Sequence, residues 1–225
     1  PMFRIPRFWL ITVLALLLGS TMIIGPELQG VRRWIAMGPV NIHVGMLVVP
    51  ALCVAVAGGD RKYTIAAFVV MSATFAAQPD RGTAIGLLFA ALIFALLRRN
   101  WISGLAVLIS GIGLTVTMYR ADQLAGVTFV EHVIEESIAD GGLTWILILT
   151  SLLAAILSPV ILIDKTKSDK LVATAVFSSF FFGLSLASVI GEYPTPLVGY
   201  GASPIIGYGL GIAMLSKQTK DTENG

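Results

Sequence analysis

The sequence predicts an all-α, polytopic membrane helical bundle with about eight transmembrane helices. The chain is 56% hydrophobic and only 12% charged, with a mean hydropathy of +0.87. Soluble domains carry about twice that charged fraction, which excludes a water-facing globular class. The apolar residues come mostly in runs of about 15–22, the length that crosses a hydrocarbon layer. Lysine and arginine gather in alternate connecting segments, as in proteins that cross the bilayer repeatedly.

Eight apolar runs define the expected helices, because lipid offers the backbone no hydrogen-bond partners. They are Phe8–Ile24, Ile42–Ala57, Tyr63–Ala77, Thr83–Leu97, Trp101–Met118, Leu143–Ile163, Leu171–Ile190 and Pro204–Leu215. The second, third and eighth are short and need flanking residues or a thinner bilayer to span. Pro50 and Pro159 are expected to kink their helices. Residues 1–225 are expected to form one integral membrane domain, ending in a short tail over Lys217–Gly225.

The distribution of basic residues predicts that both termini are cytoplasmic. With the N-terminus inside, four of the 15 lysines and arginines lie outside and the other eleven lie inside. The four outer residues are Arg32, Arg33, Arg81 and Arg120. Arg4 and Arg7 precede the first apolar run as in a signal peptide, but no A-x-A-like cleavage site follows. The run is therefore predicted to be the first span.

The overall charge and the single cysteine exclude other features. The net charge of +2 is too small to indicate a nucleic-acid partner, and Cys53 cannot form an intramolecular disulfide. Small residues at Gly183, Ala187 and Gly191 favour close packing between helices.

Two outer segments contain candidate binding residues. The segment Gly30–Pro39 contains Arg32, Arg33 and Trp34. Its two arginines lie on the outer side, where the positive-inside bias disfavours them. This pattern indicates either contact with lipid headgroups or an anion site, because arginine binds phosphate bidentately. The segment Ala76–Thr83 reads A-A-Q-P-D-R-G-T. Here Asp80 is expected to cap a helix beginning near Gly82 and to neutralise Arg81.

Two further outer segments are unusual. The segment Phe129–Glu136 is predicted to be an interfacial helix on which Glu131 faces Glu135 and His132 faces Glu136. No metal site is expected, since the spacing matches no strong metal signature, although a metal near His132 and Glu136 stays an alternative. The segment 194–203 reads P-T-P-L-V-G-Y-G-A-S. Its glycines and prolines indicate irregular backbone that faces a cavity or packed protein, with a plain re-entrant turn as the alternative.

Taken in order, these segments resemble the SEDS (FtsW/RodA) family of cell-wall polymerases. The stretch from Arg33-Trp34 to Gly38 is similar to the family's R-W-I/L-x-L-G. The stretch from Ala76 resembles A-Q-P-D-L-G-T, and the segment from Val133 resembles V-I-A-E-E-L-G. The stretch P-L-V-G-Y-G-A-S, ending at Ser203, is similar to P-L-V-S-Y-G-G-S. The match covers most of the chain.

The resemblance implies a ten-helix fold that polymerises glycan strands from lipid II beside a transpeptidase partner. Here the first two family helices have no counterpart, so the first span matches the family's third helix. The location implied is the bacterial inner membrane. The substrate-binding residues that the motifs imply are Arg32, Arg33, Trp34, Gln78, Asp80, Arg81, Thr83, Tyr200 and Ser203.

The departures from the family concern its acid/base residues. The family's proposed catalytic aspartate aligns with Thr128 or Val127, and neither can serve as a general base. Weak substitutes are Asp122, Glu131 and Glu135. The family's Q-P-S-E becomes His43-Val-Gly-Met, which lacks the carboxylate, and Gly199 replaces a serine.

Three functional hypotheses follow from this pattern. The first is a SEDS-like protein of cell-wall, cell-shape or cell-division type that no longer polymerises glycan. It would serve as a binding or assembly subunit for another membrane protein, with a membrane lipid or an undecaprenyl-linked precursor as ligand. The second is an active lipid II-dependent peptidoglycan glycosyltransferase with Glu131 as base. The third is a lipid flippase or transporter with broken helices lining its path. No cofactor is expected.

Overall fold

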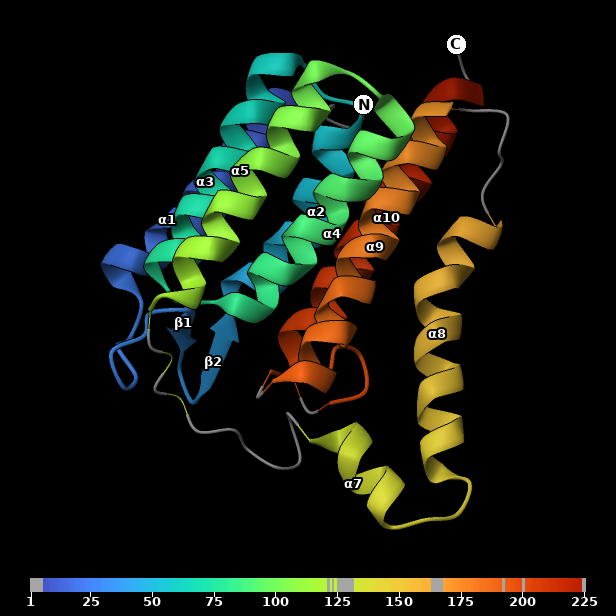
Figure 1. The fold of residues 1–225 in the computed structure, drawn as a ribbon. Coiled ribbons are helices and arrows are strands. Elements are labelled where there is room, and N and C mark those ends of the chain that lie inside the picture. Colours follow the sequence, from blue (N-terminus) through green and yellow to red (C-terminus); the bar gives the residue numbers. More distant parts are fainter. Residues whose placement is uncertain are drawn as a thin grey trace.

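The protein is a bundle of long helices with a small hairpin at one end. The computed structural model describes residues 6–120, 122, 124, 132–162, 168–191, 193–199 and 201–223. The long helices of this part are α1 (Arg7–Ile24), α2 (Val44–Ala57), α3 (Arg61–Ala77), α4 (Arg81–Arg98), α5 (Trp101–Met118), α8 (Thr144–Leu162), α9 (Ser168–Ile190) and α10 (Ala202–Glu223) (Figure 1). Strands β1 (Trp34–Met37) and β2 (Val40–His43) form the hairpin, and α7 (Val133–Ala139) is a short helix.

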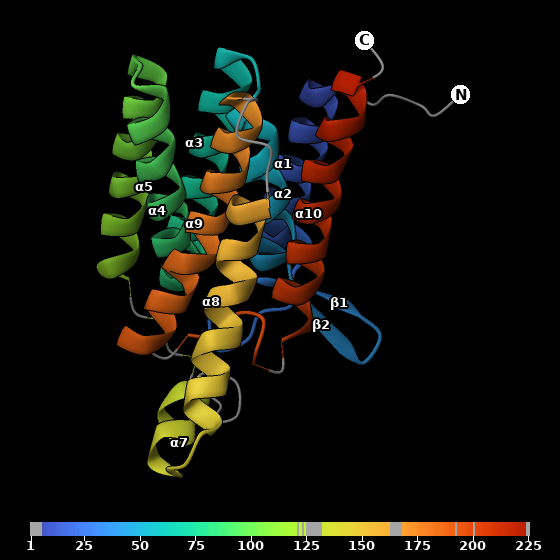
Figure 2. The ribbon, with the colours of Figure 1, turned by 90° about the vertical axis from the view of Figure 1, so that its right-hand side faces the viewer.

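Each predicted apolar run has become one long helix, which confirms the all-α, polytopic membrane architecture. In the described part of the chain, α1, α4, α5, α8 and α9 are long and apolar enough to cross a bilayer, and α2 is a shorter apolar helix. Pro50 lies within α2 and Pro159 within α8. Helix α1 begins, and α10 ends, at the same end of the bundle (Figure 2). We call this the termini end, and the opposite end the hairpin end.

The chain departs from the sequence prediction at two places. Residues Ile42 and His43, expected to begin the second helix, instead pair with Ile35 and Trp34 in the antiparallel hairpin. The turn between the strands contains Gly38 at φ +63°, a conformation that favours glycine. The tail expected from Lys217 is helical as far as Glu223, because α10 continues beyond its apolar run.

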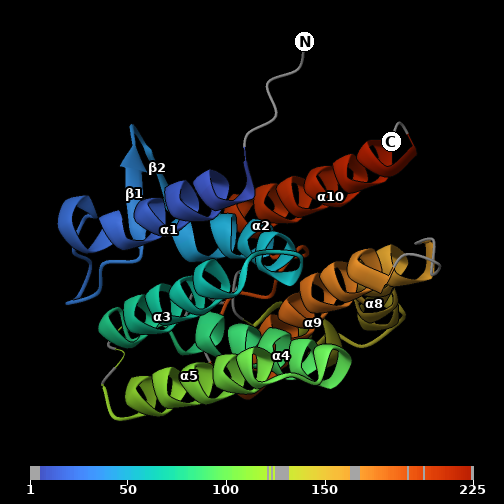
Figure 3. The ribbon, with the colours of Figure 1, turned by 90° about the horizontal axis from the view of Figure 1, so that it is seen from above.

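Helix α2 is the centre of the bundle. It lies among α1, α3, α9 and α10 when the molecule is seen from the termini end (Figure 3). Every residue of α2 except Leu47 is buried. A helix that is apolar on all sides can be satisfied by such a central position. Five fully buried phenylalanines complete the core around it: Phe68, Phe75, Phe177, Phe180 and Phe181.

Helices α4 and α9 approach each other closely because glycines face each other between them. A Cβ atom added at Gly183 would lie 2.9 Å from the Cα atom of Gly86. A Cβ atom added at Gly86 would lie 3.0 Å from the Phe180 ring. The first distance is shorter than carbon atoms tolerate and the second is at the tight limit, so this contact favours glycine on both helices. The close packing predicted from Gly183 is therefore present.

Helix α8 lies at the edge of the bundle and packs mainly against α9 and α7 (Figure 1). The Tyr208 hydroxyl of α10 donates a hydrogen bond to the carbonyl oxygen of Ala155 in α8, at 2.6 Å. Most of α8 faces outward with large apolar side chains, among them Leu147 at 66% and Ile161 at 69% exposure. An apolar surface of this extent is suited to lipid.

The substitution Gly183→Val tests the α4–α9 contact. Forcing a branched side chain against Gly86 should lower the free energy of unfolding by about 1–3 kcal/mol, the usual cost of overpacking. Thermal and denaturant unfolding in detergent would measure the change. The control is Gly111→Val on α5, where an added Cβ meets nothing within 4 Å. Equal stability of the two variants would contradict the assignment of Gly183 to a tight helix contact.

Candidate functional site

The buried side chain of Arg33 joins three segments at the hairpin end. Arg33 directly precedes β1 and is 6% exposed. Its Nε donates to the carbonyl oxygen of Gln78 at 3.1 Å, and one Nη donates to the carbonyl oxygen of Pro79 at 2.6 Å. The same Nη lies 2.5 Å from Oδ2 of Asp122, beyond the end of α5. One guanidinium therefore holds together the hairpin, the α3–α4 turn and the segment after α5.

The α3–α4 turn is fixed from both sides. The Gln78 side-chain amide donates to the hydroxyl of Thr21 on α1. Oδ1 of Asp80 accepts a hydrogen bond from the backbone N–H of Thr83 at 3.1 Å, so Asp80 caps α4 as predicted. The turn thus connects the first span to the start of α4.

A second set of contacts joins β2 to α4 and α10 through His43. Nε2 of His43 lies 3.4 Å from Oδ2 of Asp80, and Nδ1 accepts the backbone N–H of Met46 at 3.2 Å. The backbone N–H of His43 donates to the hydroxyl oxygen of Ser203 at 2.9 Å. Burial lowers the pKa of His43 below its ordinary 6.5, with Asp80 opposing and Arg33 adding to this effect. The ring is therefore neutral at pH 7, with its proton on Nε2 toward Asp80.

Arg81 faces a cavity of about 340 Å³ beside this network. Its Nε and one Nη donate to the carbonyl oxygens of Thr117 and Arg120, at 3.2 and 2.7 Å. It forms no ion pair with Asp80 or with any other described carboxylate, so the predicted neutralisation by Asp80 is wrong. Asp122 and Tyr193 also line the cavity. Burial raises the pKa of the Tyr193 hydroxyl, which keeps it protonated, although Arg81 opposes the shift.

Two polar atoms of the α3–α4 turn have no hydrogen-bond partner in the described part of the chain. They are Oε1 of Gln78 and Oγ1 of Thr83, and Oδ2 of Asp80 has only the 3.4 Å contact with Nε2 of His43; all three side chains are nearly fully buried. Buried oxygens of this kind are commonly satisfied by ordered water. The turn that binds Arg33 through its carbonyl oxygens therefore has side-chain oxygens that can accept further hydrogen bonds.

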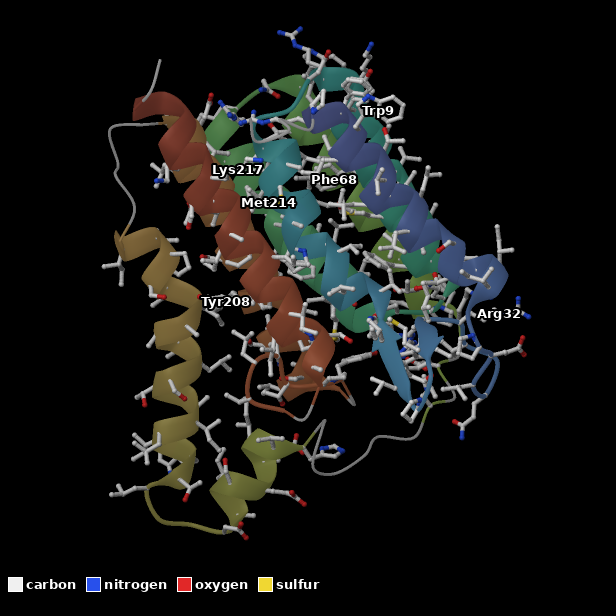
Figure 4. All side chains as sticks on the ribbon, turned by 180° about the vertical axis from the view of Figure 1, so that it is seen from behind. Trp9, Arg32, Phe68, Tyr208, Met214 and Lys217 are labelled. Carbon is white, nitrogen blue, oxygen red and sulfur yellow. The ribbon has the colours of Figure 1, made fainter. Side chains whose placement is uncertain are left out.

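Other predicted residues lie outside this network. Arg32 points away from the bundle (Figure 4), where it pairs with Glu27 at 2.8 Å on the exposed surface. Trp34 packs edge-on against His43, with ring centroids 5.8 Å apart. Glu135 pairs with His132 at 2.6 Å on the separate helix α7. The predicted residues Tyr200 and Glu131 lie outside the described residues.

The alternative of a metal site on α7 gains no support. Among the described residues, no group of three or more histidine, cysteine, aspartate or glutamate side chains could hold a metal ion. Glu136 is exposed on α7.

The structure offers cationic and hydroxyl groups at the hairpin end, which suit an anionic or sugar-bearing ligand.

Each described carboxylate that the sequence offered for catalysis is engaged by another group, and so is Asp80. Asp122 is engaged by Arg33, Asp80 caps a helix and Glu135 pairs with His132. A general base must accept a proton from its substrate, so it needs an oxygen that faces the substrate and is not already engaged by another group. None of the described candidates for the catalytic role is therefore a free carboxylate facing the cavity.

Sequence reasoning did not identify His43 and Tyr193 as site residues. His43 was noted only where the family motif loses its glutamate, and the hairpin that places its ring beside Asp80 was not predicted. The signal for the hairpin was the Gly38-Pro39 pair between two short β-prone runs. Tyr193 gave no sequence signal, because only the chain path after α9 brings it beside Arg81.

The fold is similar to that of the rod shape determining protein RodA from Thermus thermophilus, known from a crystal structure of an aspartate-to-alanine mutant. The two chains share 20% identity at a TM-score of 0.64, over 94% of this chain and 78% of RodA. Comparisons with protein-family models and with curated protein sequences find no match. The likeness establishes the fold, and it agrees with the family that the sequence motifs resemble.

The substitution Arg33→Gln tests the central contact. Removing one partner of a buried ion pair leaves Asp122 unpaired and should lower the free energy of unfolding by about 3–5 kcal/mol. The double variant Arg33→Met, Asp122→Leu should recover part of that loss. Chemical unfolding of Arg33→Met, Asp122→Leu and the double variant would give the coupling energy. The matched control is Glu27→Gln, which breaks the exposed pair with Arg32 and should cost less than about 1 kcal/mol.

The lowered pKa of His43 predicts a pH-dependent stability. The unfolded chain binds a proton near pH 6.5 and the folded chain only at lower pH, so stability is full above pH 6.5 and falls as the pH decreases below it. The unfolding midpoint should therefore drop between pH 7 and pH 5. His43→Asn should flatten this slope, whereas His132→Asn, at the chain's other histidine, should retain it. A slope that survives in His43→Asn would assign the effect to other groups.

Proposed function

We propose that the chain is a SEDS-type cell-wall membrane protein that binds a polyprenyl-phosphate-linked glycan precursor at the hairpin end. In this proposal it acts as a binding or assembly subunit of a membrane complex and does not polymerise glycan. The fold shared with RodA, a rod shape determining protein, supports the cell-wall context. Three of the four segments that carry the family-like motifs, those of Arg33, of Gln78–Thr83 and of Ser203, meet at one end of the bundle, which supports a common binding site.

The observation that carries the proposal is the environment of Arg81. This cation has no carboxylate partner among the described residues, and it lines a cavity of about 340 Å³ together with the protonated Tyr193. An arginine whose partners are neutral, here two backbone carbonyls and the Tyr193 hydroxyl, keeps its positive charge available for an incoming phosphate. The cavity also has an apolar side formed by Ile85, Met118 and Ile190, beside which a polyprenyl chain can lie.

The neighbouring contacts support binding rather than reaction at this site. Asp122 lines the same cavity but is held 2.5 Å from an Arg33 nitrogen. The Arg33 network keeps the cavity wall rigid, because the α3–α4 turn and the segment after α5 are both hydrogen-bonded to the buried guanidinium that the hairpin segment carries. A preorganised wall favours binding by reducing the entropy that is lost when a ligand is held.

Binding and polymerisation can be measured separately on purified protein in nanodiscs. A fluorescent lipid II analogue should bind, and Arg81→Gln should weaken this binding about tenfold or more, the effect of losing one charge-assisted hydrogen bond. The matched control Arg32→Gln removes an arginine of the same end that pairs with Glu27 on the exposed surface, and it should bind like the unmodified protein.

Gel analysis of the same samples for glycan polymer decides between a protein that only binds the precursor and an active glycosyltransferase. No glycan polymer is expected from lipid II. Robust polymer formation that is lost in Glu131→Gln would overturn the proposal in favour of an active glycosyltransferase. Failure to bind the analogue at all would overturn the assignment of the cavity.

A further inference from the structure

A second polar cavity lies at the termini end of the bundle. It has a volume of about 280 Å³, far larger than the roughly 30 Å³ that a water molecule occupies in the liquid. It is formed where α2 and α4 end and where α3, α5 and α9 begin. Its charged lining residues are Arg61, Arg98 and Asp169. The cavity lies at the opposite end from Arg81 and has no part in the function proposed above.

Arg98 is the central cation of this cavity. One Nη donates to the carbonyl oxygen of Ala57 at 2.6 Å and lies 2.7 Å from Oδ1 of Asp169. The Asp169 side chain is 70% exposed, whereas the Arg98 side chain is 26% exposed. A pair with one such exposed partner contributes little to stability, so another anion can replace Asp169 at small cost. The other N–H groups of the Arg98 guanidinium form no hydrogen bond with any described residue.

Aromatic side chains place this cavity at the level of the lipid headgroups. Trp9 on α1 and Trp101 on α5 are 54% and 63% exposed at the same end of the bundle (Figure 4 for Trp9). The Phe8 ring stacks on Tyr63, with centroids 5.6 Å apart. Tryptophan and tyrosine at the ends of membrane spans mark the boundary between hydrocarbon and water. A cavity beside them lies within reach of headgroup phosphates.

The surrounding charge favours an anionic ligand. Arg7 donates to the carbonyl oxygen of Gly58 in the α2–α3 turn, which itself lines the cavity. Lys62 directly follows the lining residue Arg61 in the sequence. Basic residues attract an anionic membrane surface, and basic pockets between spans on the cytoplasmic side suit anionic headgroups.

We propose that this cavity binds the headgroup of an anionic phospholipid, with Arg98 and Arg61 as ligands of its phosphate. In the absence of lipid, the carboxylate of Asp169 pairs with Arg98 in place of a phosphate. A phosphate offers more acceptor oxygens to the planar guanidinium than Asp169 uses, so a bound lipid displaces this carboxylate. The bound headgroup would then join the starts of α3 and α5 to the end of α4.

Native mass spectrometry of the full chain with short-chain lipids tests the proposal. Phosphatidylglycerol should bind at least about fivefold more tightly than phosphatidylcholine, the effect of roughly 1 kcal/mol. Arg98→Gln should remove that preference, and Asp169→Asn should increase the affinity for phosphatidylglycerol because it frees the guanidinium. The matched control Arg99→Gln removes the same charge one residue away, outside the cavity lining, and should retain the preference.

Each other outcome has a defined meaning. If Arg98→Gln does not fold, Arg61→Gln replaces it and should likewise reduce the preference. Equal binding of the two lipids, or an equal loss in Arg99→Gln and Arg98→Gln, would overturn the site. Displacement of the lipid by millimolar inorganic phosphate would show that free phosphate is the ligand, which also overturns the proposal. Lipid II binding, measured on the same variants, should not change.

Discussion

The buried guanidinium of Arg33 is the contact on which the hairpin end depends. It lies where five parts of the chain meet: the hairpin, the α3–α4 turn, the segment after α5, and, through His43, the starts of α2 and α10. A buried cation is costly unless its donors are paired, so the segments that supply the acceptors cannot move away independently. This requirement turns irregular, polar chain segments at membrane depth into a defined wall.

The helical bundle below that wall is held by a different kind of force. Lipid removes most of the hydrophobic advantage of packing one helix against another, so close contact must come from shape. Glycines at Gly86 and Gly183 let α4 and α9 touch, and α2 fills the centre with an apolar surface on every side. Helix α8, which has few such contacts, lies at the edge and presents its apolar face outward. The bundle is therefore rigid at the centre and less constrained on the α8 side.

The two ends of the bundle use arginine differently. At the hairpin end, the guanidinium of Arg33 is paired with the carboxylate of Asp122, whereas Arg81 donates to two carbonyl oxygens and forms no ion pair with a described carboxylate. At the termini end, Arg98 has an exposed carboxylate as a replaceable partner. In both cases the partner of the guanidinium, rather than the presence of arginine, decides whether the charge is available. The neighbouring residues Arg32 and Arg33 show the same distinction within a single dipeptide.

The sequence by itself determined the eight long helices and their order, because the need to satisfy backbone groups in lipid leaves a visible run of apolar residues for each span. It also identified Arg33, Gln78, Asp80 and Ser203 as one group through their motifs. Only the tertiary structure decided which of these side chains meet. Arg32 and Arg33 are identical in type, yet one faces water and the other the turn of residues 78–80. His43 lies at the site because of the hairpin, and Tyr193 lies there because of the path of the chain after α9. Hydropathy records the length of a span, whereas a polar contact between residues 45 or 160 positions apart depends on three-dimensional packing that no local pattern encodes.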